Sequence, residues 1–315
     1  MQQYDLIIIG GGLAGAGLAV ALRDAPLRIA LVEGSAPRPP DGWDARIYAI
    51  SPANAAFLER IGAWRHLDAG RMAPIRAMEV HGDGGGRLDF SAFEVGVPEL
   101  GWILESSAMA CELWESAKRQ GNLTLFCPAR PAQLDIGDES AVVTLADGSA
   151  LSARLVVGAD GRDSWVRQMG GLVANTTDYG DQGVVANFET ALPHRGVARQ
   201  WFRHDGVLAW LPLSGNRISI VWSTPDDHAA ELCALPAGLF CDRVAEAFPS
   251  VQKQLPEGLS GKIVYDATDY VDSYLERGGQ WYTSIGYAPM AEGQLDWEIC
   301  PSLGDADDYS IRIVG

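Results

Sequence analysis

The sequence predicts an α/β protein that combines a Rossmann-like nucleotide-binding domain with a second domain built on a mostly antiparallel sheet. Two observations predict this fold class. The β-branched run Tyr4 to Ile9 leads through a glycine-rich turn into an apolar helix and then into a second short strand, Leu27 to Val32, which is the order of a βαβ unit. Residues 182–224 then contain four successive segments in which polar and apolar residues alternate, as they do in antiparallel strands.

The composition is that of an ordinary globular protein and excludes a disordered or fibrous chain. Of the 315 residues, 47% are hydrophobic and 21% are charged, which suits one large domain or two smaller ones. The 24 basic and 41 acidic residues give a net charge of -17, and such a charge repels phosphate backbones. We therefore expect no nucleic-acid partner.

The cysteines and the first residues of the chain favour the cytoplasm. The five cysteines are odd in number, widely spaced and without a CxxC pair, which fits neither a disulfide framework nor a zinc site. We therefore expect no metal site. The start, MQQYDLIIIGGG, lacks the basic segment of a signal peptide, and its apolar run is too short to span a bilayer.

The glycine-rich turn carries the strongest functional signal. Gly10, Gly12 and Gly15 have G-x-G-x-x-G spacing between the first strand and the helix that begins at Leu13. In this motif the first glycine permits a tight turn, the second lets the backbone approach a pyrophosphate, and the third lets the helix pack on the strand. The N–H groups of Leu13 and Ala14 at the helix N-terminus would face the phosphates. A merely structural turn is the alternative.

Glu33 closes the second strand, where a carboxylate can accept hydrogen bonds from the hydroxyls of a ribose. The same acid argues against a nucleotide that carries a 2′-phosphate. The motif therefore predicts FAD or NAD and does not by itself distinguish the two.

Three further residues are candidates for the site, and each has a plain structural alternative. Asp160 and Gly161 follow the short apolar strand Arg154 to Gly158, at the strand end where open α/β sheets contact ligands. Asp160 could equally be the cap of a helix. Arg46 lies in a Pro-rich loop, and a solvated loop arginine is its simpler interpretation.

Aromatic side chains are dense in the alternating segments between residues 182 and 224. They could line a cavity for an apolar or aromatic substrate, and packing in the core would explain them equally well. They are Phe188, Trp201, Phe202, Trp210 and Trp222.

Taken together, these motifs resemble a known family. GGGLAG with Glu33, DARIYAISPAN with Arg46, and VVGADGRDSWVR are similar to motifs of the flavoprotein aromatic hydroxylases of the para-hydroxybenzoate hydroxylase type. Within that group, VVANFET, ARQWF, GVLAWLPL and ISIVWS resemble the ubiquinone-biosynthesis hydroxylases of the UbiH/UbiF/UbiI type. The resemblance extends over residues 4–225.

The resemblance implies FAD as the cofactor and a division of the chain into two domains. An FAD-binding domain would comprise residues 1–75 with 100–180 and part of 278–315, and a substrate domain would comprise residues 76–99 with 181–277. The cofactor-binding residues would be Gly10, Gly12, Leu13, Ala14, Gly15 and Glu33 on the ADP half, Arg46 near the ribityl-pyrophosphate region, and Asp160 and Gly161 beside the cofactor and the reductant.

The implied reaction is hydroxylation of an aromatic ring, that of a ubiquinone precursor. NAD(P)H would reduce FAD, oxygen would add at flavin C4a, and the resulting hydroperoxide would transfer its distal oxygen to the ring. The resemblance assigns no catalytic side chain. The implied partners are a small aromatic substrate, polyprenylated in that pathway, and other proteins of the pathway. A polyprenylated substrate would bring the protein into peripheral contact with the inner membrane.

One fingerprint of the family is missing near the C-terminus. Where the family has a strand ending in Gly-Asp, the chain reads WYTSIGYAPMAEGQLDWE, with Tyr287 in place of the acid. Gly304-Asp305 supplies the dipeptide without the loop that follows it in the family. The departure keeps a second hypothesis open, a non-catalytic dinucleotide- or lipid-binding member of a ubiquinone-biosynthesis assembly. A third hypothesis, an NAD-dependent dehydrogenase, uses the glycine motif alone.

Overall fold

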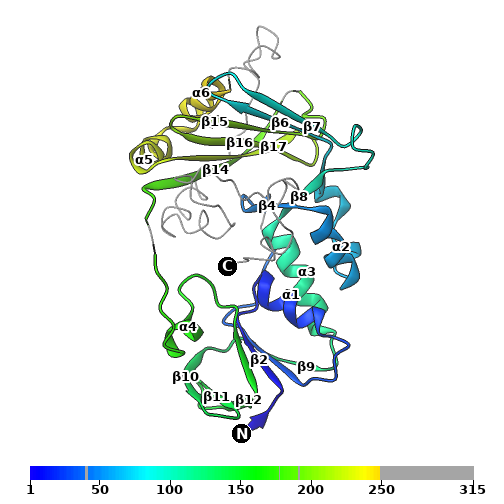
Figure 1. The fold of residues 1–315 in the computed structure, drawn as a ribbon, viewed down its shortest axis with the longest axis vertical. Coiled ribbons are helices and arrows are strands. Elements are labelled where there is room, and N and C mark those ends of the chain that lie inside the picture. Colours follow the sequence, from blue (N-terminus) through cyan, green and yellow to red (C-terminus); the bar gives the residue numbers. More distant parts are fainter. Residues whose placement is uncertain (40–41, 177, 191, 249–315) are drawn as a thin grey trace.

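A four-stranded parallel sheet forms one end of the computed structural model, which describes residues 1–39, 42–176, 178–190 and 192–248. The strands, in the order β13–β2–β3–β9, are Leu155–Gly158, Leu6–Ile9, Ile29–Val32 and Leu123–Phe126. β2 and β3 are buried throughout, as expected of apolar runs without polar alternation. Ile9 is level with Val32 on one side and Gly158 on the other, so these strands end at one edge of the sheet (Figure 1).

Different layers cover the two faces of the parallel sheet. The helices α1 (Leu13–Ala21) and α3 (Ser106–Lys118) lie on one face, where Trp114 shares a buried cluster with Ile8. A second four-stranded sheet lies on the other face, with Val143 in the same core cluster as Ile7 and Ile9. Its strands, in the order β1–β12–β11–β10, are Gln2–Gln3, Ala150–Ala153, Ala141–Leu145 and Pro131–Ile136. The predicted βαβ unit is therefore confirmed.

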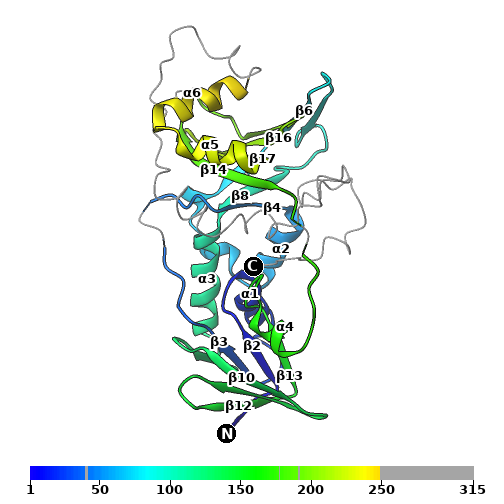
Figure 2. The same ribbon diagram turned by 90° about the vertical axis from the view of Figure 1, so that its left-hand side faces the viewer.

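A small antiparallel sheet lies between the two ends of the molecule (Figures 1 and 2). Its strands, in the order β4–β8–β5, are Ile47–Ile50, Gly101–Glu105 and Ala73–Ile75. β8 runs directly into α3, which extends from this sheet toward the parallel sheet. The helix α2 (Pro52–Arg60) follows β4, and Ser51 caps it by accepting a hydrogen bond from the N–H of Asn54 at 3.2 Å. The 3-10 turns η1 (Trp64–His66) and η2 (Ala69–Arg71) lead into β5.

A six-stranded sheet forms the other end of the molecule. Its strands, in the order β14–β17–β16–β15–β6–β7, are Asp181–Glu189, Arg217–Pro225, Gly206–Leu213, Val197–Arg203, Ala77–Gly82 and Arg87–Ser91. All neighbouring strands are antiparallel except β15 and β6, which are parallel. The predicted combination of a Rossmann-like domain with a mostly antiparallel sheet is confirmed.

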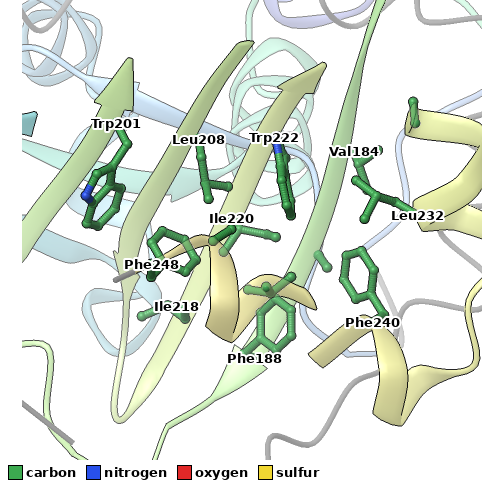
Figure 3. Close-up of a cluster of buried hydrophobic side chains, with 14 residues drawn as sticks. Val184, Phe188, Trp201, Leu208, Ile218, Ile220, Trp222, Leu232, Phe240 and Phe248 are labelled. Carbon is green, nitrogen blue, oxygen red and sulfur yellow. The ribbon is translucent and has the colours of Figure 1, made fainter. Parts of the chain in front are cut away.

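Two helices cover one face of the six-stranded sheet, and most of the aromatic side chains lie beneath them (Figure 3). The helices are α5 (Asp226–Ala234) and α6 (Ala237–Ala247). Phe188, Trp201 and Trp222 are at most 7% exposed and pack in one cluster with Phe240 and Phe248. Core packing, rather than a cavity wall, is therefore the reason for the aromatic residues on this face.

The opposite face of the six-stranded sheet packs on the small sheet. Val185, Ala209 and Val221 share a buried cluster with Ile75 and Ile103. This contact joins the two ends of the described structure.

The C-terminal segment and the expectation about membrane-spanning helices complete the comparison with the sequence. Tyr287, Gly304-Asp305 and the segment 278–315 lie outside the described residues. Within the described ranges, no helix has both the length and the apolar character needed to cross a membrane.

Candidate cofactor site

The three motif glycines stand in three different environments. Gly10 has a φ of 102°, and a Cβ on it would lie 2.2 Å from the carbonyl oxygen of Ala159. A Cβ on Gly15 would lie 1.8 Å from the carbonyl oxygen of Gly10. Gly12, the N-cap residue of α1, has nothing within 4 Å of its Cβ position. Two of the glycines therefore permit close backbone packing, and the third leaves open space in front of the helix N-terminus.

Glu33 lies just beyond the end of β3, beside the glycine turn. Its carboxylate accepts hydrogen bonds from the N–H of Gly11 at 2.5 Å and of Ser35 at 2.9 Å. Its backbone N–H donates to the carbonyl oxygen of Phe126 at 2.9 Å. Burial first, and then the negative charge of Glu33, raise the pKa of the nearby Cys127 thiol.

Asp160 organises the turn between β13 and α4 (Trp165–Met169). Its Oδ1 accepts a hydrogen bond from the hydroxyl of Ser164 at 2.6 Å, and its Oδ2 accepts one from the N–H of Val166 at 3.1 Å. Gly161, with a φ of 90°, adopts the left-handed conformation that glycine favours. Asp160 therefore makes the contacts expected of a helix cap, and it also lies at the end of β13, where a ligand contact is expected.

Arg46 is half-buried and immediately precedes β4. Its backbone N–H donates to Asp44 Oδ1 at 2.9 Å, and its carbonyl oxygen accepts from the N–H of Ser106 at 2.8 Å. Its guanidinium group forms no ion pair with any carboxylate of the described residues. A half-buried cation without a counter-charge suits an anionic ligand.

One cavity brings these residues together. It has a volume of about 540 Å³ and lies at the carboxyl edge of the parallel sheet. Eight of the nine cofactor-binding residues expected from the sequence line it: Gly10, Gly12, Leu13, Ala14, Glu33, Arg46, Asp160 and Gly161. Gly15 is the exception, since it packs behind the turn against Gly10.

The cavity also contains residues that the sequence did not single out. Tyr48 comes from β4, Ser106 from the start of α3, and Trp165 from α4. Arg130 is exposed and, like Arg46, forms no ion pair within the described ranges. Tyr48 lies within the motif DARIYAISPAN and Trp165 within VVGADGRDSWVR. Ser106 and Arg130 belong to no recognised motif, so only the packing of distant segments places these two here.

The geometry fits a dinucleotide. The open position at Gly12 lets a pyrophosphate approach the N-terminus of α1, where the helix dipole and the free N–H groups favour negative charge. Arg46 supplies a positive charge on the same cavity. Each oxygen of Glu33 accepts one backbone N–H, which leaves lone pairs for the hydroxyls of a ribose.

Comparison with known proteins agrees with this geometry. Ubiquinone hydroxylase UbiL of Rhodospirillum rubrum is 37% identical over 240 residues, which cover 75% of this chain and 55% of that protein. The 3-demethoxyubiquinol 3-hydroxylase of Escherichia coli is 29% identical, over 79% of this chain and 64% of that protein. The chain thus spans 55% and 64% of the length of these two curated relatives.

A solved structure shares the fold. PqsL of Pseudomonas aeruginosa in complex with 2-aminobenzoylacetate superimposes with a TM-score of 0.66 and 22% identity, over 86% of this chain and 70% of that one. Residues 3–233 match the family described as FAD binding domain. The resemblance seen in the sequence is confirmed, and FAD, the expected cofactor, is the cofactor of that family. The chain belongs to the FAD binding domain family.

Proposed function

We propose that this protein is an FAD-dependent monooxygenase that hydroxylates an aromatic ring of a ubiquinone precursor. The observation that supports it most is the single cavity that collects the glycine turn, Glu33, Arg46 and the Asp160-Gly161 turn. The two curated relatives, a ubiquinone hydroxylase and a demethoxyubiquinol hydroxylase, support the reaction class. Bound FAD would supply the redox and oxygen chemistry, with NAD(P)H as the electron donor.

In this proposal the chain's own residues bind and orient the cofactor. Gly12, Leu13 and Ala14 present the N-terminus of α1 to the pyrophosphate, and Glu33 binds the adenosine ribose. Arg46, which lines the same cavity, neutralises phosphate charge. Gly10 and Gly15 keep the turn close-packed, and the Asp160-Gly161 turn closes the cavity beside the reductant.

The proposed domain division follows the sheets. Residues 1–75 with 100–180, and part of 278–315, would form the FAD-binding domain, and residues 76–99 with 181–277 the substrate domain. The membership of β6 and β7 in the six-stranded sheet supports this division, because both strands lie between β5 and β8 in the sequence.

The proposed substrate has consequences for partners and location. A ubiquinone precursor carries a polyprenyl chain, which partitions into lipid. We therefore expect a cytoplasmic protein that contacts the inner membrane peripherally or receives its substrate from other proteins of the pathway. Its net charge of -17 disfavours direct binding to anionic lipid.

A visible absorption spectrum of the purified chain, before and after addition of FAD, tests whether the protein binds this cofactor. A bound two-banded flavin spectrum, together with substrate-stimulated NAD(P)H oxidation and a hydroxylated product, is the expected result. A protein that takes up no FAD would overturn the proposal. A protein that binds FAD but neither oxidises NAD(P)H nor yields product would support the non-catalytic alternative.

A further inference from the structure

The segment that carries Arg46 is held by one deeply buried carboxylate. Glu105, at the junction of β8 and α3, is 1% exposed. Its Oε1 accepts a hydrogen bond from the N–H of Asp44 at 2.6 Å and one from Arg71 Nη2 at 2.6 Å, and its Oε2 accepts one from Arg71 Nε at 2.5 Å. We call residues 42–46 the Arg46 segment. Glu105 thus binds this segment and Arg71 at the same time.

Arg71 directs its remaining contacts to the same segment. Its Nη2 also donates to the carbonyl oxygen of Gly42 at 2.7 Å, and its guanidinium lies 4.4 Å from the centre of the Trp43 ring. Arg217, from the six-stranded sheet, lies 5.1 Å from the centre of that ring. The hydrogen bond with Glu105 is the main cause that raises the pKa of Arg71 above its ordinary value.

Asp44 joins the segment to the start of α3. Its Oδ2 accepts a hydrogen bond from the N–H of Ser107 at 2.9 Å, while its Oδ1 accepts from the N–H of Arg46 at 2.9 Å. Its carbonyl oxygen accepts from Asn187 Nδ2 of β14 at 3.2 Å. Asp44 therefore provides the cap of α3 that Glu105, its N-cap residue, does not provide.

These contacts point toward Arg46. Besides pairing with each other, Glu105 accepts a hydrogen bond from the N–H of Asp44, and Arg71 donates one to the carbonyl oxygen of Gly42. Asp44 in turn accepts a hydrogen bond from the backbone N–H of Arg46. Arg46 lines the cofactor cavity and forms no ion pair with any carboxylate of the described residues. Glu105 is buried while Arg71 is partly exposed, and a buried carboxylate whose two oxygens both accept hydrogen bonds is held in one orientation.

We infer that Glu105, through Arg71 and Asp44, is a positioning residue that orients Arg46 toward the pyrophosphate of the cofactor. The inference rests on the proposed function, because it assumes that Arg46 meets a bound dinucleotide. Glu105 itself does not line the cavity, so its effect on the cofactor is indirect.

A double-mutant cycle on FAD affinity tests the inference. FAD dissociation constants are measured by flavin fluorescence for the wild-type chain, Glu105→Gln, Arg46→Ala and the double variant. In the carboxylate, Oε1 accepts from Asp44 and from Arg71 Nη2, and Oε2 accepts from Arg71 Nε. A glutamine places an NH2 donor at one of these two positions, so it loses at least one of the three contacts and the negative charge that faces Arg71. We expect Glu105→Gln to weaken FAD binding about tenfold with Arg46 present and less than about twofold in the Arg46→Ala background, within the usual range of coupling between linked residues.

Two further variants keep the test decisive. Arg71→Lys retains the charge but loses the two-nitrogen contact, and it enters the same cycle if Glu105→Gln does not fold. Glu79→Gln is the matched control, because it breaks the part-buried pair of Glu79 with Arg199, 2.8 Å long, away from the cavity. Thermal unfolding without FAD is recorded for every variant, and the control is expected to leave FAD affinity unchanged.

The outcomes separate the inference from the proposed function. Equal losses of affinity with and without Arg46 would show that Glu105 acts only on the fold, and would overturn the inference while FAD binding stands. An Arg46→Ala variant with wild-type affinity would also overturn it. A wild-type chain that binds no FAD would overturn the proposed function and the inference together.

Discussion

The carbonyl oxygen of Gly10 lies 1.8 Å from the place where a Cβ on Gly15 would stand. No side chain can occupy that position without moving the backbone of the turn. Gly12, between them, has no atom within 4 Å of its Cβ position. Two glycines of the motif are therefore required for close packing, and the third, Gly12, has open space at its Cβ position and lines the cavity.

This difference predicts that substitution of Gly15 mainly lowers stability, whereas substitution of Gly12 mainly lowers FAD affinity. Gly15→Ala should lower the free energy of unfolding by about 1–3 kcal/mol through overpacking. Gly12→Val should cost no more than about 1 kcal/mol, the difference between glycine and an apolar N-cap, yet reduce FAD affinity more than about tenfold by blocking the pyrophosphate. Urea unfolding and FAD titration measure both effects. Equal stability losses in the two variants would contradict the assignment.

Asp160 offers a test of whether it does more than cap a helix. Ser164 caps α4 by accepting a hydrogen bond from the N–H of Arg167 at 3.1 Å, and it donates to Asp160. Asp160→Ala and Ser164→Ala should therefore each lower stability by about 1 kcal/mol. We expect only Asp160→Ala to weaken FAD binding as well, because Asp160 lines the cavity and Ser164 does not. Matching FAD affinities in the two variants would leave Asp160 as a cap alone.

Trp201 should matter for stability and not for the cofactor. It lies 4.6 Å from Phe248, ring centre to ring centre, under α6. Trp201→Leu should lower the free energy of unfolding by about 2–4 kcal/mol, since a large buried side chain is shortened, with an unchanged FAD dissociation constant. The control Phe93→Ala, at a side chain 92% exposed, should change neither quantity. A large loss of FAD affinity in Trp201→Leu would place this face near the cofactor instead.

Asp181 gives a pH-dependent prediction. Burial first, and then the charge of Asp226, raise the pKa of Asp181 above its ordinary value. An acid whose folded pKa is raised destabilises the folded state at pH values above that pKa, where it must be charged. Asp181→Asn should therefore stabilise the protein at pH 7, and the gain should shrink to zero as the pH falls through the folded pKa to below about 4. Thermal unfolding across this pH range measures the gain. A gain that persists at pH 3 would be inconsistent with a titration of Asp181.

Local patterns in the sequence predicted the elements that build the site. The G-x-G-x-x-G spacing located the β2–α1 turn, and the apolar run Leu27 to Val32 located β3. The short apolar run Arg154 to Gly158 likewise located β13. Each of these signals is read within a few residues, because a turn, a cap or a strand period depends on neighbours in the chain.

Contacts between distant residues were beyond such patterns. Alternation indicates that the two faces of a strand differ but not what covers each face. The sequence therefore did not decide whether Trp201 and Trp222 pack in the core or line a cavity. The helices α5 and α6 decide that question. Likewise, Arg130 reaches the cavity and Glu105 reaches Arg71 only because segments far apart in the chain pack together.

The sequence by itself determined the βαβ unit, the glycine turn, the acid at the end of β3 and the family resemblance, because these depend on residue types at short and regular spacing. The tertiary structure alone decided that eight of the nine expected residues share one cavity, that Asp160 is bound to Ser164 and Val166, and how Arg46 is held. The reason is physical. A side chain's neighbours across the molecule are set by how sheets and helices pack on one another, and that packing is a property of the whole chain rather than of any short stretch.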